Sequence, residues 1–199
     1  MIYLPKDLAK LLDKPLPRPK RDTPGYAAAR VLEALLEALI ALRFLEEGLT
    51  RNSAGKAFLA WRALTGALLA LERDRVLGRL VGVEQRKWLL ERAVPRVPSS
   101  RLHALGQLLE DSGITGFSAY TAIALLLHDY QYHGPDPAGE LSKYTTREEA
   151  ARDILYLLDK LVETVENLKP RLKEAKKWTQ DHEEALQKLQ ERLRKAQQH

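Results

Sequence analysis

The stretch that decides the fold class is residues 146–196, TREEAARDILYLLDKLVETVENLKPRLKEAKKWTQDHEEALQKLQERLRKA. Its apolar side chains recur at alternating spacings of three and four residues, and only Thr179 and His182 interrupt the two repeating apolar positions. This period is typical of an α-helix that packs along one seam. Thr146 and Glu149 have the spacing of a capping box, which marks where the helix begins.

The register of this pattern continues through Pro170, a residue that kinks a helix. We therefore predict one bent helix of about 50 residues, roughly 75 Å long at the usual rise per residue. Such a helix is longer than a compact domain. Its distal half needs a partner, either another subunit or the chain's own N-terminal helix.

The rest of the chain also has helical periodicity, and no segment alternates apolar and polar residues as a β-strand does. Helices are expected over 5–13, 25–47, 50–73, 83–93, 100–111 and 118–133. The stretch PLPRPKRDTP, residues 15–24, is predicted to be an extended linker. The sequence thus predicts an all-α bundle in three parts: a short helix and basic linker (1–24), a helical bundle (25–168) and an extended, coiled-coil-like C-terminal helix (169–199).

Composition excludes several classes of protein. The 199 residues include no Cys, which excludes a disulfide scaffold and a Cys-ligated metal centre. No glycine-rich phosphate loop or dinucleotide fingerprint is present, which argues against the common nucleotide-dependent α/β enzymes. The formal net charge of +5 is concentrated toward the two ends of the chain and suits an acidic partner such as nucleic acid.

The location of the protein is expected to be cytoplasmic, without a membrane partner. The N-terminus lacks the apolar core of a signal peptide, and the longest uncharged run, 112–128, is too short and too polar to span a bilayer. The scarcity of Asn and Cys beside 30% charged residues fits a thermophile.

A first group of candidate ligand-binding residues lies at the start of the helix expected at 50–73. Arg51, Asn52 and Lys56 place donors near a helix N-terminus, where an anion is favoured. Small apolar neighbours surround Lys56, so its pKa is lowered or its ammonium reaches out to a phosphate or carboxylate. The alternative is a helix start capped by Thr50 or Asn52, with Lys56 paired to a core carboxylate such as Asp129.

A second group crowds the end of the next long helix and the loop after it. Its candidates for ligand binding are His128, Asp129, Tyr130, His133, Asp136, Tyr144 and Arg147. A His there suits general base chemistry. Asp129 and His133 are spaced to share one metal, but no third ligand completes the set, so neither a metal nor a cofactor is predicted. The alternative is a polar helix end followed by the stop signal Gly134-Pro135.

Three stretches resemble a known family: RNSAGKAFLAWRALTGALLA (51–70), HDYQYHGPD (128–136) and KYTTREEAARDI (143–154). Together they are similar to the archaeal PaREP family, which is grouped in the HEPN superfamily, and the similarity covers about residues 25–168. The resemblance implies an up-and-down helical bundle, often dimeric. Many superfamily members are ribonuclease toxins or partners of nucleotidyltransferases.

The ribonuclease motif of that superfamily is Arg followed, after four to six residues, by His. At the matching position Arg51 is followed by Lys56 instead. Arg96 and His103 satisfy the spacing, but Pro98 lies between them and disfavours one shared helix. The departure argues against nuclease activity.

Three functions are therefore kept as hypotheses. The first is a non-catalytic binding or assembly module, homodimeric through its helices including the C-terminal one, and associated with nucleic acid or a nucleotidyltransferase-type partner. The second is a metal-independent ribonuclease, in which Arg51 with Lys56, or Arg147 with His128, polarises the phosphate and a His moves protons. The third is a binder of a small nucleotide or anion through Lys56, Arg51 and Tyr130.

Overall fold

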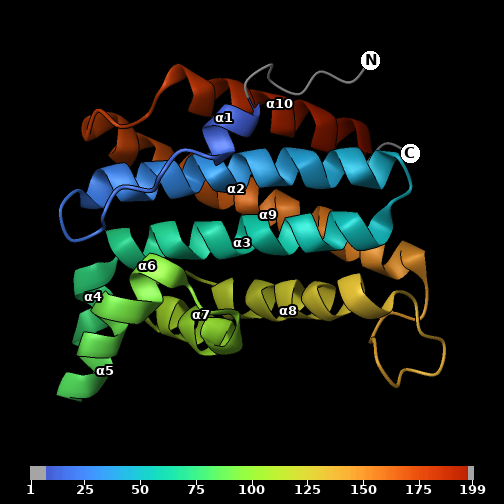
Figure 1. Ribbon diagram of the computed structural model, residues 1–199, viewed down its shortest axis with the longest axis horizontal. Helices are drawn as coiled ribbons and strands as arrows, with labels where there is room; N and C mark the ends of the chain where they lie inside the picture. Colours follow the sequence, from blue (N-terminus) through green and yellow to red (C-terminus); the bar gives the residue numbers. More distant parts are fainter. Residues whose placement is uncertain (1–7, 197–199) are drawn as a thin grey trace.

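The computed structural model describes residues 8–196, and every regular element in that range is a helix (Figure 1). The prediction of an all-α bundle is confirmed. The helices are α1 (Leu8–Leu12), α2 (Thr23–Glu46), α3 (Thr50–Leu71), α4 (Arg73–Gly78), α5 (Val83–Trp88), α6 (Val94–Arg96), α7 (Leu102–Asp111), α8 (Phe117–His133), α9 (Arg147–Glu174) and α10 (Gln180–Ala196). A π-helical turn, Leu89–Ala93, joins α5 to α6, and a 3₁₀ turn, Ser99–Arg101, precedes α7. The start of the helix expected at 5–13 lies outside the described residues.

The centre of the bundle is the antiparallel pair α2 and α3, joined by a tight turn at Gly48 (φ 73°). Alanines fill the faces where the two helices meet, and Ala34, Ala38, Ala57 and Ala60 are fully buried. Small side chains let the helix axes approach closely. This approach brings the Ser53 hydroxyl within 2.8 Å of the Ala41 carbonyl, to which it donates a hydrogen bond.

Helix α3 is buried on nearly all sides, because α8 and α9 cover the faces that α2 leaves open. Trp61 is fully buried, stacks on Phe117 at 4.5 Å and donates to the Thr121 hydroxyl at 3.0 Å, as expected for a core residue. Among the described residues α3 is also the one helix long and apolar enough to cross a membrane. However, 78% of its most apolar window is buried inside the bundle, as in the core helix of a globular domain.

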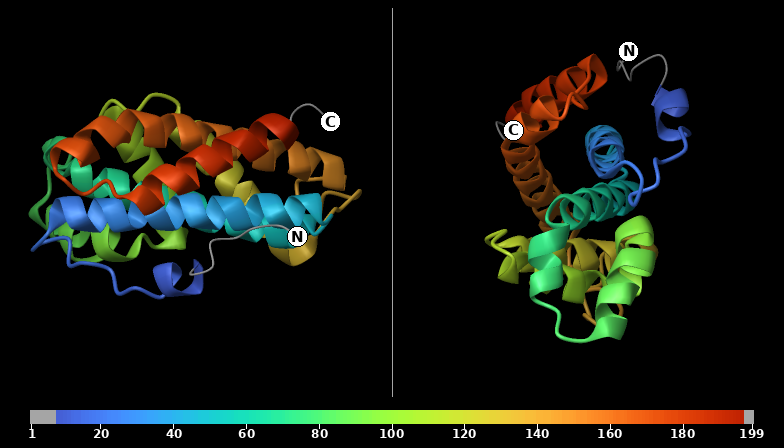
Figure 2. Two further views of the ribbon diagram at one scale, coloured as in Figure 1. Left: turned by 90° about the horizontal axis from the view of Figure 1, so that it is seen from above. Right: turned by 90° about the vertical axis from the view of Figure 1, so that its left-hand side faces the viewer.

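The C-terminal region differs from the single long helix that the heptad pattern predicted. Helix α9 does continue through Pro170, but it ends at Glu174, and α10 turns back along α2 and α9 (Figure 2). The predicted seam is nonetheless the buried one, since Leu186, Leu189 and Leu193 are buried. Folding back covers this seam within the same chain, on α2 rather than on a short N-terminal helix. A homodimer through this region stays a prediction, and so does the domain division at 168, which α9 crosses without a break.

The turn between α9 and α10 explains where the helix stops. Lys176 adopts a left-handed conformation (φ 56°), which a continuing helix does not allow. Lys177 then pairs with Asp22, the residue that caps α2, at 3.0 Å. The Trp178 indole donates to Glu183 at 2.8 Å, so this aromatic residue finds its partner within the chain.

His182 of α10 is nearly fully buried, and its ring links α10 to α2 through hydrogen bonds. One ring nitrogen lies 2.9 Å from the Ala28 carbonyl, and the other accepts from the Thr179 amide at 3.2 Å. Both bonds require the neutral ring, with its proton on the nitrogen that faces Ala28. Burial lowers the pKa of His182 below its ordinary value of 6.5, although the Ala28 carbonyl and Asp181 act in the opposite direction.

This geometry predicts a pH-dependent stability. Above pH 6.5 the His182 ring is neutral in the folded and the unfolded chain, so the full free energy of unfolding is retained. As the pH falls below 6.5, the unfolded chain binds a proton at His182 more readily than the folded chain does. The free energy of unfolding therefore decreases. Urea unfolding at pH 7.5, 6.5 and 5.5 measures the fall, and His182→Gln should reduce it. His128, whose pKa burial also lowers, contributes in the same range, so His128→Gln is measured alongside. An unchanged pH dependence in His182→Gln would contradict the assignment. Glu183, with a pKa of about 2, acts only below pH 4.5 and does not interfere.

Candidate functional site

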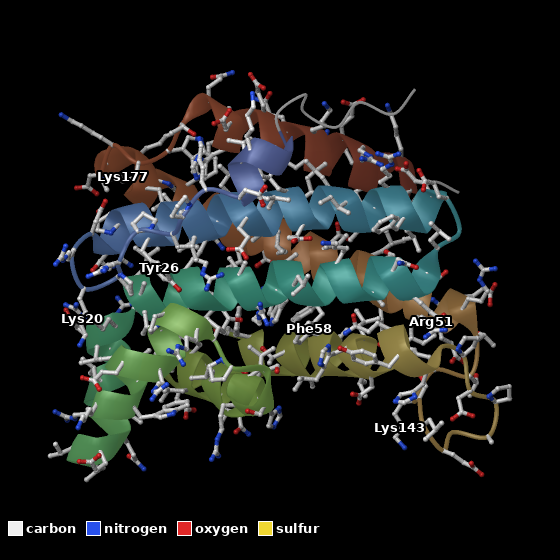
Figure 3. The ribbon with its side chains drawn as sticks, in the orientation of Figure 1. Lys20, Tyr26, Arg51, Phe58, Lys143 and Lys177 are labelled. Carbon is white, nitrogen blue, oxygen red and sulfur yellow. The ribbon has the colours of Figure 1, made fainter. Side chains whose placement is uncertain are left out.

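Four of the residues singled out from sequence meet at one end of the bundle, where α2 ends, α3 begins, α8 ends and α9 begins (Figure 1). Arg51, Asn52, Tyr130 and Arg147 line a single pocket of about 240 Å³. Gly48, Leu49, Thr50 and Pro135 complete its walls. Figure 3 shows Arg51 at this end, far from Lys20 at the other. We call this cavity the α3 pocket.

Arg51 joins α3 to the C-terminus of α8. Its Nε donates to the Gln131 carbonyl at 3.0 Å and one terminal nitrogen donates to the Tyr132 carbonyl at 2.5 Å. These carbonyls lack donor partners within the helix and carry the negative end of its dipole. Arg51 therefore satisfies the end of α8, while its second terminal nitrogen has no hydrogen bond to a described residue and remains a donor at the pocket.

Arg147 performs the corresponding task on the other side of the α3 pocket. A terminal nitrogen donates to the Gly48 carbonyl at 2.5 Å and lies 3.4 Å from the Thr50 hydroxyl. The start of α9 is capped by Thr146 and Glu149 as predicted, so Arg147 is not needed there and reaches across to the α2–α3 turn. The contact fixes a guanidinium beside the first residues of α3.

The N-terminus of α3 has no side-chain cap. Its N-cap residue is Leu49, and the expectation that Thr50 or Asn52 caps the helix is wrong, because Thr50 itself lies within the first turn. The first N–H groups of a helix lack acceptors within it and carry the positive end of the dipole. These amides therefore add to the positive potential at the α3 pocket.

Tyr130 is the aromatic residue that lines the α3 pocket. The residue is 1% exposed, and its ring packs edge-on against Tyr144, with ring centroids 5.4 Å apart. Its hydroxyl makes no hydrogen bond to any residue that the structure describes and is not a fully buried atom, so it can reach a ligand. Burial raises the pKa of this hydroxyl, although Arg147 and Arg51 act in the opposite direction, so it stays protonated at neutral pH.

Taken together, the α3 pocket offers a hydroxyl, two guanidinium groups and the start of a helix. None of its lining residues is an acid. Donors gathered without a carboxylate suit an anion, because each can hold one of its oxygens while the positive charges offset the negative one.

Two of the predicted ligand residues instead build the loop between α8 and α9. The Asp136 carboxylate accepts backbone N–H bonds from Ala138, Gly139, Leu141 and Ser142, which lower its pKa. Tyr144 donates its hydroxyl to Asp153 at 2.8 Å, and its carbonyl accepts from the Asp136 amide at 2.8 Å. Both side chains thus hold the loop against α9 and do not line the α3 pocket.

The remaining candidates lie elsewhere. Lys56 pairs with Glu37 on α2 at 2.9 Å, not with Asp129 as the alternative named. His128 stacks on Phe58 at 4.0 Å, in the contact between α3 and α8, and Asp129 and His133 are exposed. None of these four candidates lines the α3 pocket, so the structure does not bring Lys56 and His128 to one site with Arg51.

Arg96 and His103, which have the spacing of the superfamily motif, do not lie on one helix. Arg96 ends α6, and His103 lies in α7. Between them Val97 takes a left-handed conformation (φ 43°), so the two side chains do not share a helix. The described residues also contain no group of three His, Asp or Glu placed to hold a metal ion.

Sequence reasoning missed Glu37 as the partner of Lys56. The signal was present, because Glu37 is a carboxylate in an otherwise apolar part of the helix expected at 25–47, and a buried carboxylate needs a counter-charge. It also missed the Gly48 carbonyl, since a backbone acceptor leaves no mark in the pattern of residue types.

The Lys56–Glu37 pair predicts a structural effect. In Lys56→Met the buried Glu37 carboxylate loses its partner, and we expect a loss of about 2 kcal/mol in the free energy of unfolding, measured by urea denaturation. Adding Glu37→Gln should restore part of it. Arg43→Ala, which breaks an exposed pair with Glu47, is the control and should cost less than about 0.5 kcal/mol. A Lys56→Met variant as stable as the wild type would contradict the assignment.

The comparison with known proteins gives one match. Residues 29–155 match the profile of the archaeal PaREP1/PaREP8 family, which takes in α3, α8, the loop after α8 and the start of α9. No curated protein and no solved structure matches the chain significantly. The matched segment contains every residue that lines the α3 pocket and spans well over half of the chain. The chain belongs to the archaeal PaREP1/PaREP8 family.

Proposed function

We propose that this protein is a non-catalytic binding module whose α3 pocket takes the phosphate group of a small molecule, such as a nucleotide. The observation that carries the proposal concerns Tyr130, which lines the α3 pocket: its hydroxyl is protonated and makes no hydrogen bond to any described residue. It is flanked by the two guanidinium groups of Arg51 and Arg147. A phosphate oxygen is an acceptor that suits all three.

The size of the α3 pocket favours a ligand that enters only in part. Its volume of about 240 Å³ is below the range of pockets that enclose a whole drug-sized molecule. The phosphate would bind at the base and the rest of the ligand would extend outward.

A ribonuclease activity has less support. Neither His of the candidate set lines the α3 pocket, since His128 packs between α3 and α8 and His133 is exposed. Lys56, which stands where the superfamily motif has His, forms an ion pair with Glu37. Without a general base at the phosphate, binding is the better supported role. Association with nucleic acid or with a nucleotidyltransferase remains part of the proposal, resting on the family resemblance alone.

Calorimetric titration with inorganic phosphate, adenosine 5′-monophosphate and adenosine tests the proposal. Phosphate and the monophosphate should bind, and adenosine should bind far more weakly. Tyr130→Phe and Arg147→Gln should each weaken the monophosphate by about tenfold or more, because each removes a hydrogen bond to a charged group.

The matched control is Arg152→Gln, an exposed arginine of the same helix that does not line the α3 pocket; its affinity should equal that of the wild type. Lys56→Met should also bind normally once its stability is allowed for. Absence of phosphate and monophosphate binding, or wild-type affinity in both Tyr130→Phe and Arg147→Gln, would refute the proposal.

A further inference from the structure

The opposite end of the molecule carries an arm that the proposed function does not use. Helices α4 and α5 leave the bundle beside the linker that precedes α2, and the turn between them is its outermost part (Figures 1 and 2). The base of the arm is fixed, since Tyr26 donates to the Val94 carbonyl at 2.6 Å and Arg30 reaches the Pro95 carbonyl. The turn itself, residues 79–83, is closed by Arg86, which donates to the Leu80 carbonyl at 2.9 Å. We call residues 79–88 the arm tip.

The arm tip presents apolar side chains to solvent. Val81 is 96% exposed and Val83 is 78% exposed, the highest values among the large apolar residues of the described chain. The conformation of the turn does not require valine at these positions, because a polar side chain there could form its hydrogen bonds with water. Trp88 is partly exposed and Leu80 continues the same apolar surface into a groove of about 450 Å³.

Cations surround this apolar surface. Arg79 and Lys87 are exposed and make no ion pair with any described residue, and Arg86 keeps its terminal nitrogens free of carboxylates. Within the arm tip Glu84 is the single acid. Along residues 73–101 the basic side chains are Arg73, Arg75, Arg79, Arg86, Lys87, Arg92, Arg96 and Arg101, against Asp74, Glu84 and Glu91. Residues 73–101 therefore carry a surplus of five positive charges.

We propose that the arm tip docks on the surface of an anionic lipid bilayer, with Val81 and Val83 entering the headgroup region. A bilayer surface accepts apolar and positive side chains together, since the apolar groups leave water while the cations remain among the phosphates. The partly exposed Trp88 suits the same depth, where its ring is apolar and its N–H stays hydrated.

Two other occupants fit less well. A nucleic acid would pair with the cations, but Val81 and Val83 have no hydrogen-bonding groups to offer it and would stay in water. A protein partner would need a concave acceptor for a tip that projects, whereas a fluid bilayer adapts to its shape. The absence of a lipid-spanning segment at the arm does not bear on docking, because the tip lies on the membrane rather than across it.

Sedimentation of the full chain with vesicles tests the proposal. The protein should bind vesicles of phosphatidylcholine mixed with phosphatidylglycerol, bind phosphatidylcholine alone far more weakly, and lose affinity as salt rises. Arg79→Gln with Lys87→Gln should lower the partition coefficient about 25-fold, at roughly fivefold for each cation. Val81→Ser with Val83→Ser, which leaves the charge unchanged, should lower it about tenfold.

The controls carry the same changes at the far end of the bundle. Lys143→Gln with Arg194→Gln removes two exposed cations, and Leu141→Ser removes a side chain that is 66% exposed. Both should bind as the wild type does. Trp88 adds a spectroscopic readout, because Trp61 is fully buried and the Trp178 indole is bonded to Glu183 away from the arm. The fluorescence of Trp88 should shift to the blue on vesicles, and Trp88→Phe should remove the shift.

Three results would overturn the proposal: no binding of the wild type to the anionic vesicles, wild-type affinity in the double valine variant, or binding to single-stranded RNA in place of vesicles. Circular dichroism checks that each variant folds, and the substituted side chains are exposed, so folding should be retained. The arm and the α3 pocket lie at opposite ends of the bundle, so failure here leaves phosphate binding untouched.

Discussion

The close contact between α2 and α3 is the constraint on which the rest of the structure depends. Alanines such as Ala38 and Ala57 let the two helices pack closely. Helix α3 is therefore the central helix of the bundle, and α8 and α9 pack against its remaining faces. Because these helices run alternately up and down, the end where α3 begins is also where α8 ends and α9 begins. Helix ends carry unpaired backbone groups, and this place brings together the end of α2, the start of α3, the end of α8 and the start of α9.

Those backbone groups explain which side chains occupy that end. Arg51 satisfies the carbonyls of α8 and Arg147 satisfies the turn before α3, so each arginine has a structural reason to lie there. Their charges are nevertheless left without a carboxylate at the α3 pocket. The Tyr130 hydroxyl makes no hydrogen bond to a described residue and so has no such structural task, and this is what distinguishes the pocket from an ordinary capped helix end.

Helical periodicity predicted most of the fold, because burial of a helix face leaves a regular trace in the sequence. Most buried leucines of α9 and α10, such as Leu161, Leu186 and Leu189, occupy the two repeating positions, and the buried Leu157 does not. The break at Lys176 was not predictable from that pattern, since turning back onto α2 preserves the same register of buried positions. The site was predicted in part: Arg51, Asn52, Tyr130 and Arg147 converge, whereas Asp136 and Lys56 satisfy local backbone and core charges that a list of polar residues does not reveal.

The central claim is that the donors at the start of α3 form a pocket prepared for phosphate. A titration of ¹⁵N-labelled protein with inorganic phosphate, followed by amide chemical shifts in NMR spectra, tests it most directly. The account predicts saturable shifts at the Thr50, Arg51 and Asn52 amides that disappear in Tyr130→Phe with Arg147→Gln. Shifts confined to the cations of the arm, or amides of the first turn of α3 that do not respond, would contradict it.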